Sequence, residues 1–254
     1  MQPVRPKKHL GQHFLHREDV AERIANVALT YNVSGPLLEI GPGTGMLTKY
    51  LLKNENIQLK ACELDRDSVE YLKQHYPDLE VFSTDFLKAK PSDFFTEPFS
   101  IMGNFPYNIS SQIVFWALEC DGEVPFLAGM FQREMAQRIT ASPGGKDYGI
   151  ISVLTQSMYE CKYLFTVSEG AFNPPPKVKS GVIALKRLDT LPDIDFRFFK
   201  AMVKTAFGQR RKTMRNSLRS MVKPEMLSLP IFDKRPEQLS VKELQELSVE
   251  IKGV

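Results

Sequence analysis

The segment Leu37-Leu-Glu-Ile-Gly-Pro-Gly-Thr-Gly45 runs from a short apolar stretch directly into three glycines at alternate positions. This pattern predicts a β-strand that enters a glycine-rich turn at the start of a helix. Glycine lets the backbone turn tightly and lie against a ligand, where a Cβ atom would intrude. The same kind of turn also occurs without a ligand, and with Pro42 inside it departs from the dinucleotide-binding spacing Gly-x-Gly-x-x-Gly. The segment therefore predicts a fold class and marks a candidate ligand site.

Around this segment, from about residue 36 to 187, short apolar runs alternate with amphipathic runs, which predicts an α/β fold with a mainly parallel sheet. The expected strands are residues 37–40, 58–63, 79–83, 99–102 and 126–131, and the expected helices are residues 45–53, 67–75, 111–119 and 133–140. Residues 150–159 combine β-branched side chains with helical spacing and are predicted to form a helix. Residues 163–167 and 182–185 are expected to form a terminal hairpin around the proline-rich turn at 173–176.

After Arg187 the pattern changes to helical periodicity. Residues 189–192 are polar, contain a proline and predict a hinge. Beyond them, apolar residues recur at helical spacing from Phe196 to Phe207, and Ser240-Val-Lys-Glu243 matches a capping box. We therefore expect two domains, residues 1–188 with the sheet and residues 189–254 as a small all-helical domain.

Basic residues are concentrated in two segments of a chain whose formal net charge is only +3. Residues 1–17 hold four Lys/Arg and residues 200–223 hold eight, and neither segment contains an acidic residue. Two such segments indicate local contact with a polyanion such as a nucleic acid, and a solvated helix face is the alternative.

Other features of the composition exclude several classes of protein. The longest apolar runs are far too short to cross a bilayer, and the basic N-terminus has no apolar signal-peptide core. We therefore expect a cytoplasmic protein with no membrane partner. Cys62, Cys120 and Cys161 lie far apart and form no paired metal-binding spacing, so buried free thiols and no metal site are expected.

Residues with ligand chemistry follow the expected strands. Glu63 ends the second strand, 22 residues beyond Gly41, where an acid can accept both hydroxyls of a ribose. Asp85 follows the third strand, where a carboxylate can accept from an adenine amino group while Phe86 covers the ring; a turn aspartate is the plain alternative. Asp65 is expected to be a helix N-cap. Because ligands of open α/β sheets lie outside the carboxyl ends of the strands, the aligned strand ends favour a binding site.

The Asn104-Phe105-Pro106-Tyr107 corner follows the apolar strand at 99–102. It presents two acceptors and an aromatic face together, the set that an amino group on a flat nitrogen heterocycle needs before it attacks a methyl donor. Adenine N6 is a poor nucleophile because its lone pair is delocalised into the ring. Asn104 Oδ1 and the Phe105 carbonyl can accept both N6–H bonds, and Tyr107 stacked on the base stabilises the growing positive charge by about 1–2 kcal/mol. Methylation of an adenine amino group is therefore the leading interpretation.

Seven motifs occur in one order along nearly the whole chain: Lys8-His-Leu-Gly-Gln-His-Phe-Leu15, Glu39–Gly45, Glu63-Leu-Asp65, Asp85-Phe86, Asn104–Ile109, Phe172-Asn-Pro-Pro-Pro-Lys-Val178 and Arg210-Arg-Lys-Thr-Met-Arg-Asn-Ser-Leu218. Together they resemble the ribosomal RNA small-subunit adenine N6-dimethyltransferases of the KsgA type. The ordered set is highly specific, whereas a single motif would not be. Two positions depart from the commonest pattern of that family: His13 stands where asparagine is frequent, and Phe105 where leucine is frequent.

The resemblance implies a Rossmann-like class I methyltransferase sheet with helices on both faces and S-adenosyl-L-methionine as the methyl donor. It implies transfer to N6 of two adjacent adenosines in the 3′-terminal hairpin of small-subunit (16S) rRNA, which become N6,N6-dimethyladenosines. The expected partner is this rRNA within an immature subunit during ribosome biogenesis, and the protein is expected to act as a monomer.

The resemblance also assigns site residues. The cofactor contacts that it implies are Gln12, His13, Leu15, Gly41, Gly43, Glu63, Asp85, Phe86 and Asn104. The catalytic residues that it implies are Asn104, Phe105, Pro106, Tyr107 and Phe172, the last as a second ring that holds the flipped base. The basic residues expected to bind RNA on the helical domain are Lys204, Arg210, Arg211, Lys212, Arg215 and Arg219.

Three other functions stay open at this level. A macrolide-resistance methyltransferase, which methylates an adenine of large-subunit RNA, shares the Asn-x-Pro-Tyr corner and the glycine turn, but residues 11–15 and 211–217 favour the small-subunit enzyme. An RNA-binding assembly factor without activity has no need of Asn104, Tyr107 or the pair Glu63 and Asp85. A small-molecule methyltransferase has no need of the basic helical domain.

Overall fold

The computed structural model describes residues 4–120 and 122–253. Residues 1–3 and 254, at the ends of the two expected domains, lie outside the described residues. The described chain forms two compact units: residues up to 136 with residues 162–187, and residues 137–161 with residues from 188 onward. This grouping differs from the expected boundary after residue 188 in the placement of residues 137–161.

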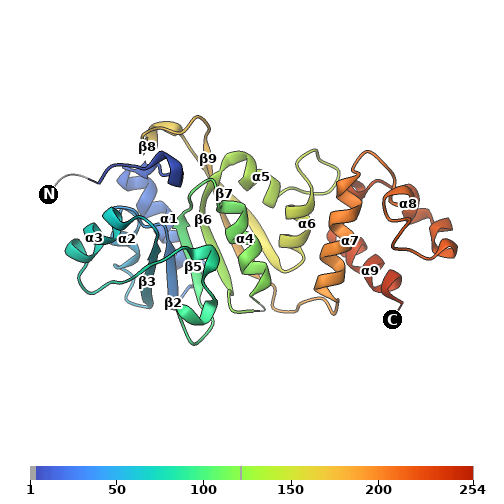
Figure 1. Cartoon of the computed structure of the whole chain (residues 1–254), viewed down its shortest axis with the longest axis horizontal. Coiled ribbons are helices and arrows are strands. Elements are labelled where there is room, and N and C mark those ends of the chain that lie inside the picture. Colours follow the sequence, from blue (N-terminus) through green and yellow to red (C-terminus); the bar gives the residue numbers. More distant parts are fainter. Residues whose placement is uncertain (1–3, 121, 254) are drawn as a thin grey trace. The chain divides into compact units, whose positions relative to one another are not determined.

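The first unit is built on a seven-stranded sheet (Figure 1). Its strands, in chain order, are β2 (Gly35–Ile40), β3 (Ile57–Glu63), β4 (Glu80–Ser83), β5 (Ser100–Asn104), β6 (Phe126–Gln132), β7 (Tyr159–Val167) and β9 (Ser180–Arg187). They lie in the order β4-β3-β2-β5-β6-β9-β7. The first five in this order are parallel, and β9 runs antiparallel to β6. The expected α/β fold is therefore confirmed, and the five strands expected in the parallel sheet lie within two residues of their observed bounds.

β2 and β5 lie side by side, and the strands that follow each of them in the chain are added on opposite sides of this pair. From β2 the chain moves one way, through α2 (Thr48–Leu51) to β3 and through α3 (Arg66–His75) to β4. From β5 it moves the other way, through α4 (Ser110–Glu119) to β6. Because crossovers between parallel strands are right-handed, the two sets of helices cover opposite faces of the sheet, as expected. A crevice opens at such a reversal, so the carboxyl ends of β2 and β5 mark the place for a ligand.

A helix that was not predicted, α1 (Glu18–Thr30), packs against β6 and completes the hydrophobic core of this unit. Its side chains Ala21, Ile24 and Ala28 are fully buried. These residues recur at intervals of three and four, which is the period of a helix with one apolar face. The signal was therefore present in the sequence.

Two expected helices are shorter than predicted. The helix expected at 45–53 is reduced to α2, because Gly43 and Gly45 have φ values of 57° and 80° and hold the preceding turn out of the helical conformation. The helix expected at 150–159 ends as α6 (Ile150–Gln156), and Tyr159 already begins β7. Pairing of β7 with β9 at the sheet edge thus overrides the local helical spacing. The two runs expected to form a terminal hairpin do lie in these neighbouring strands.

The remaining elements of the chain are short. A second, two-stranded sheet joins β1 (Phe14–Leu15) to β8 (Phe172–Asn173) in antiparallel register. α5 (Arg133–Ile139) follows β6 directly. The 3-10 helices are η1 (Lys8–Leu10), η2 (Phe86–Lys88), η3 (Pro91–Asp93), η4 (Glu169–Ala171), η5 (Pro224–Ser228), η6 (Pro230–Asp233) and η7 (Pro236–Gln238).

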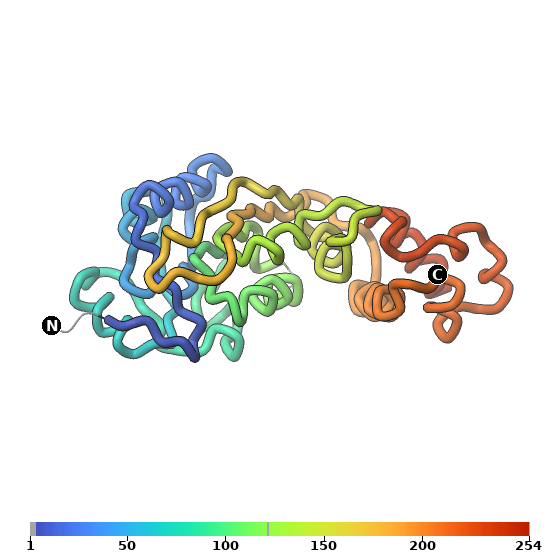
Figure 2. Tube along the Cα trace, turned by 90° about the horizontal axis from the view of Figure 1, so that it is seen from above, coloured from blue at the N-terminus to red at the C-terminus, as the bar shows by residue number. Residues whose placement is uncertain are grey.

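The second unit is helical, and Figure 2 follows its residues after 188 in orange and red. Besides α6 it contains α7 (Phe196–Gly208), α8 (Met214–Ser217) and α9 (Val241–Lys252). The expected capping box is confirmed, since the Ser240 hydroxyl accepts from the N–H of Glu243, whose carboxylate accepts from the N–H of Ser240. The fully buried residues of its core include Tyr148, Val153, Phe199, Met202, Phe232 and Leu244.

Residues 137–161 join the helical unit through α6, which packs against α7. Gln245 Nε2, from α9, also donates to the backbone carbonyl of Ser157 at 3.4 Å. These contacts explain why the structural boundary differs from the expected one: α6 buries its apolar side chains against residues that come about fifty positions later. The assignment of separate catalytic and RNA-binding domains stays a prediction. In the part of the chain that the structure describes, no helix is long and apolar enough to span a membrane.

Candidate functional site

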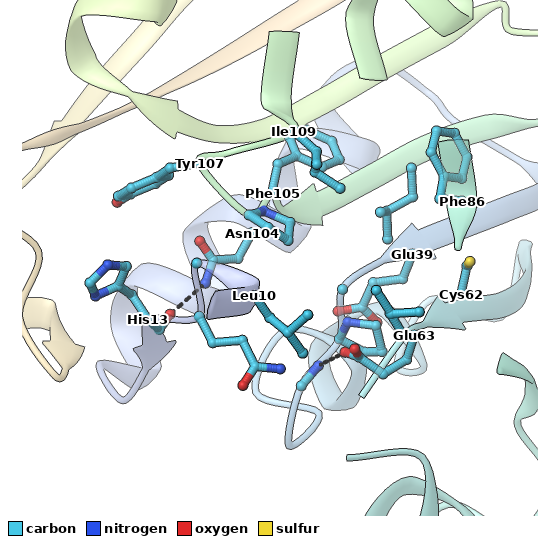
Figure 3. Close-up of a pocket in the computed structure, with 18 of the residues that line it drawn as sticks. Leu10, His13, Glu39, Cys62, Glu63, Phe86, Asn104, Phe105, Tyr107 and Ile109 are labelled. Carbon is cyan, nitrogen blue, oxygen red and sulfur yellow. Dashed lines mark hydrogen bonds between the residues drawn. The ribbon is translucent and has the colours of Figure 1, made fainter. Parts of the chain in front are cut away.

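A cavity of about 200 Å³ lies in the first unit at the carboxyl ends of the parallel strands (Figure 3). Its walls come from the N-terminal segment, the glycine turn after β2 and the ends of β3, β4 and β5. All of the expected cofactor contacts line it: Gln12, His13, Leu15, Gly41, Gly43, Glu63, Asp85, Phe86 and Asn104. The fold therefore brings together, at one point, residues that are up to 92 positions apart in the sequence, from Gln12 to Asn104.

The glycine turn and Glu63 form one connected wall of this cavity. Glu63 Oε2 accepts from the backbone N–H of Gly43 at 3.0 Å, and Oε1 accepts from the N–H of Asp65 at 2.8 Å. A Cβ atom on Gly43 would lie 3.1 Å from the ring of Phe14. Burial raises the pKa of Glu63, and the backbone N–H bonds act against that rise. The carboxylate is thus held rigidly at the end of β3, as an acceptor beside a turn that has no room for side chains.

The two aspartates singled out in the sequence have different positions. Asp65 caps α3, as expected, by accepting from the N–H of Asp67 at 3.3 Å, and it is also paired with Lys7. Asp85 lines the cavity and at the same time caps η2, where Oδ1 accepts from the N–H of Leu87 at 3.1 Å. Asp85 is therefore both a capping residue of a turn and part of the cavity wall.

Asn104 is the last residue of β5, and its amide has a defined orientation. Its Nδ2 donates to the backbone carbonyl of His13 at 3.1 Å, the bond drawn in Figure 3. With the nitrogen engaged, Oδ1 remains as the acceptor. The ring of Phe105 is buried against Phe131 with ring centroids 4.9 Å apart, and the backbone N–H of Phe105 donates to the backbone carbonyl of Met130 at 3.2 Å. Buried packing thus holds the backbone of the corner in place next to the Asn104 amide.

Tyr107 also lines the cavity. Its hydroxyl shares a hydrogen bond with Ser180 Oγ, and its ring stacks on that of His13 with centroids 5.5 Å apart and planes 29° apart. Burial raises the pKa of Tyr107 although the Ser180 bond lowers it, so the phenol stays neutral near pH 7. The corner therefore combines an oriented amide acceptor with a neutral aromatic ring.

The sequence also matches the family model described as ribosomal RNA adenine dimethylase, over residues 4–250. The chain belongs to this family. A relative called ribosomal RNA small subunit methyltransferase A, from Cytophaga hutchinsonii, is 49% identical over 100% of both chains. A relative with the same name from Parabacteroides distasonis is 50% identical over 98% of this chain and 95% of that one.

Two solved structures have the same fold. A dimethyladenosine transferase from Plasmodium falciparum superposes with a TM-score of 0.81 at 22% identity, covering 94% of this chain and 98% of that chain. The 23S rRNA methyltransferase ErmE superposes with a TM-score of 0.69 at 28% identity, covering 92% of this chain and 98% of that chain. The expected class I methyltransferase architecture is therefore confirmed.

One residue that the family resemblance assigned to catalysis is not brought to the cavity. Phe172 is 3% exposed and belongs to the hydrophobic core cluster, and it does not line the cavity. The reason is its strand pairing: in the β1–β8 register Phe172 lies opposite Leu15, so that its ring packs inward. In the structure the Phe172 ring therefore lies in the core and outside the cavity, and its role as a second stacking ring stays a prediction.

Several residues that line the cavity were not predicted, and Glu39 is the most informative. It is 1% exposed, and its Oε2 accepts from Thr48 Oγ1 at 2.6 Å. Burial raises the pKa of Glu39 to about 8, and the nearby charge of Glu63 adds to this effect. The sequence contained one signal for this residue, a carboxyl group inside the otherwise apolar run Leu37–Ile40. Cys62, Leu64 and Asn108 also line the cavity, without a comparable signal.

We predict that Glu39→Gln changes how stability depends on pH. An acid whose folded pKa is raised contributes its stability below the ordinary value of 4.5 and loses it as pH rises through about 8. For each pH unit in this window the free energy of unfolding falls by at most about 1.4 kcal/mol, which lowers Tm by about 3–6 °C. The variant should lack this fall, so its Tm should exceed that of the parent increasingly from pH 5 to 8. Thermal melts across this range measure the difference.

The exposed Glu55→Gln is the matched control, and its melting curve should stay parallel to that of the parent protein at every pH. A Glu39→Gln curve that is also parallel to the parent would show that Glu39 does not titrate in this window.

The basic residues expected to bind RNA fall into two groups in the helical unit. The guanidinium of Arg210 donates to the backbone carbonyls of Lys146 at 2.6 Å and Gly145 at 2.8 Å, and Arg215 pairs with Asp233 at 2.7 Å. Both side chains therefore already have partners inside the unit. Arg215 is nevertheless exposed, as are the other four: Lys204, Arg211, Lys212 and Arg219.

Proposed function

We propose that this protein transfers methyl groups from S-adenosyl-L-methionine to N6 of two adjacent adenosines in the 3′-terminal hairpin of small-subunit (16S) rRNA. The products are N6,N6-dimethyladenosines, and the reaction belongs to biogenesis of the subunit. Full-length relatives 49–50% identical carry the name of a small-subunit methyltransferase. The observation that supports the chemistry most directly is the Asn104 amide, oriented by the His13 carbonyl at the edge of the cavity.

The residues of the cavity fit the proposed donor. When bound, S-adenosylmethionine supplies a methyl group on a sulfonium sulfur. Glu63 offers a fixed carboxylate for the ribose hydroxyls, and Asp85 offers one for an adenine amino group. The backbone of Gly41 and Gly43 allows close approach, because neither residue carries a side chain at the cavity wall.

The corner orients the target amine. Asn104 Oδ1 and the Phe105 carbonyl accept the two N6–H bonds, which turns the lone pair of N6 towards the donor side of the cavity. Positive charge grows on N6 as the bond forms, and acceptors that are already in place stabilise this charge more than the neutral ground state. The face of Tyr107 adds a cation–π attraction of about 1–2 kcal/mol. Asn104 therefore acts as an orienting acceptor, and no strong base is needed at the attacking step.

We propose that the exposed cations of the helical unit hold the RNA backbone of an immature small subunit, with the protein acting as a monomer. Lys204, Arg211, Lys212 and Arg219 are exposed, so their charges are accessible to phosphates. They position the substrate without reading its sequence. Arg210 and Arg215 are proposed to contribute through the fold of this unit.

Salt dependence tests this division among the cations. With four phosphate contacts, one for each of these cations, log K against log salt should fall with a slope of about −3 to −4. Arg211→Ala should make the slope shallower by about 1. Its neighbour Arg210→Ala is the matched control: it should lower Tm, because two carbonyls lose their donor, and leave the slope unchanged. Filter-binding titrations with small-subunit RNA at several salt concentrations measure both slopes, and a flat response of the parent would contradict phosphate binding.

The reaction itself is tested by incubating the protein and labelled S-adenosylmethionine separately with small and large subunits that lack methylation. Label is expected in the small subunit, at the two adjacent adenosines after mapping. Label in the large subunit alone would indicate the macrolide-resistance reaction. Binding to the small subunit without any label would indicate an assembly factor that has no activity.

A further inference from the structure

Tyr107 lies in the connection between β5 and α4, outside regular structure, yet two contacts hold it in place. Its hydroxyl pairs with Ser180 Oγ, and its ring stacks on that of His13. Neither partner is a neighbour in sequence: Ser180 is 73 residues away. The position of the ring is therefore set by tertiary contacts and not by its own loop.

Ser180 is a rigid anchor. It is fully buried and is the first residue of β9, where it pairs with Gln132 of β6. The backbone carbonyl of the preceding residue, Lys179, accepts from the N–H of Arg133 at 2.9 Å. This second bond fixes the start of β9 against the end of β6. A buried hydroxyl needs a partner, and Tyr107 provides it. The bond thus ties the phenol to the central sheet.

His13 connects both parts of the catalytic corner. Its ring stacks on Tyr107, and its Nδ1 lies 2.8 Å from the carbonyl oxygen of Pro174. Its own backbone carbonyl accepts from Asn104 Nδ2. Asparagine, the residue frequent at this position in the family, has no ring with which to make the first contact. The imidazole therefore contacts the Tyr107 ring while its own backbone holds the Asn104 amide.

We propose that Ser180 and His13 are positioning residues for the target base, because they fix the plane of the Tyr107 ring on which the adenine stacks. The inference rests on the proposed function. A ring already held in its binding orientation loses little freedom when the base arrives, whereas a ring that rotates must be ordered first. The consequence is a lower KM for the RNA substrate, with little effect on binding of the methyl donor.

A double-mutant cycle on the hydroxyl pair tests the role of Ser180. Ser180→Ala and Tyr107→Phe each remove one side of the same bond, so each should raise KM for the unmethylated small subunit by about 3- to 10-fold with a smaller change in kcat. In the double variant KM should rise no further than it does in either single variant, because both substitutions break the same bond. Losses that multiply in the double variant, or an unchanged KM in both single variants, would refute the role of Ser180. Binding of S-adenosylhomocysteine should stay within twofold, because a general structural defect would weaken it.

Tyr163→Phe is the matched control for the cycle. It removes a tyrosine hydroxyl that pairs with Thr166 in β7, away from the cavity, and should leave KM unchanged. His13→Ala tests the stacking partner: KM for the RNA, measured at saturating S-adenosylmethionine, should rise because the ring contact with Tyr107 is lost. A loss confined to S-adenosylhomocysteine affinity, with KM for the RNA unchanged, would leave His13 only as the cofactor contact that the family resemblance implies and refute its role here. A parent protein that methylates neither subunit would refute the proposed function, whereas an active parent with unaffected variants would refute only this inference.

Discussion

Replacing Asn104 by alanine is expected to reduce methyl transfer by about 100- to 1,000-fold, while the variant still binds the immature small subunit. Removing one preorganised polar group that acts in a transition state has an effect of this size in other enzymes. In the variant, one N6–H loses its acceptor and the lone pair of the amine is no longer turned to the donor. The amide bond to the His13 carbonyl is lost as well. Single-turnover assays at saturating S-adenosylmethionine measure the rate, and filter binding measures RNA affinity.

Asn108→Ala is the matched control for this experiment. Asn108 also lines the cavity but lies four residues beyond Asn104 and is exposed. It is expected to keep a methylation rate within about threefold of the parent. Full activity of Asn104→Ala would exclude the proposed mechanism, and loss of activity together with loss of RNA binding would point to a misfolded corner instead.

Replacing Glu63 by alanine is expected to weaken binding of S-adenosylhomocysteine by at least about 100-fold. Two hydrogen bonds from ribose hydroxyls to a carboxylate contribute about 3–6 kcal/mol, and each 1.4 kcal/mol corresponds to a factor of ten in Kd. In the parent protein the Glu63 carboxylate accepts hydrogen bonds from the backbone N–H groups of Gly43 and Asp65. The variant lacks these bonds, so the glycine turn is less firmly held. Isothermal titration calorimetry measures the change in Kd directly.

The fold should survive this substitution, because the relief of the carboxylate's desolvation offsets the two hydrogen bonds lost at Gly43 and Asp65. Glu39→Gln is the comparison: it changes the other buried carboxyl of the cavity and should bind S-adenosylhomocysteine with nearly unchanged affinity. An unaltered Kd in Glu63→Ala would rule out its proposed role, and equal losses in both variants would indicate a general collapse of the cavity.

Much of the fold could be predicted from the sequence because its signals are local. Short apolar runs that alternate with amphipathic runs marked the parallel strands, and the Ser240 capping box marked the start of α9. Strand ends were informative for the site as well, since parallel strands present their carboxyl ends at one edge of the sheet. Glu63, Asp85 and Asn104 therefore meet at the cavity as expected. Their roles in binding and catalysis stay proposals.

Other features depended on partners that are distant in sequence. Phe172 has the expected motif around it, but the β1–β8 pairing with Leu15 directs its ring into the core. Arg210 has the charge of an RNA contact, but two backbone carbonyls, those of Gly145 and Lys146, occupy its guanidinium. Residues 137–161 join the helical unit because α6 packs on α7. None of these outcomes has a local signal.

The positions of the parallel strands along the chain, the glycine turn, the caps at Asp65 and Ser240 and the family motifs were thus determined by the sequence alone, because backbone conformation and hydrophobic period depend on neighbouring residues. The tertiary structure alone decided which side chains reach the cavity, how the Asn104 amide is turned and what holds Tyr107. Those outcomes depend on hydrogen bonds and ring contacts between segments 73–91 residues apart, such as Tyr107 with Ser180 and Asn104 with His13. Such contacts exist only once the sheet has brought the segments together.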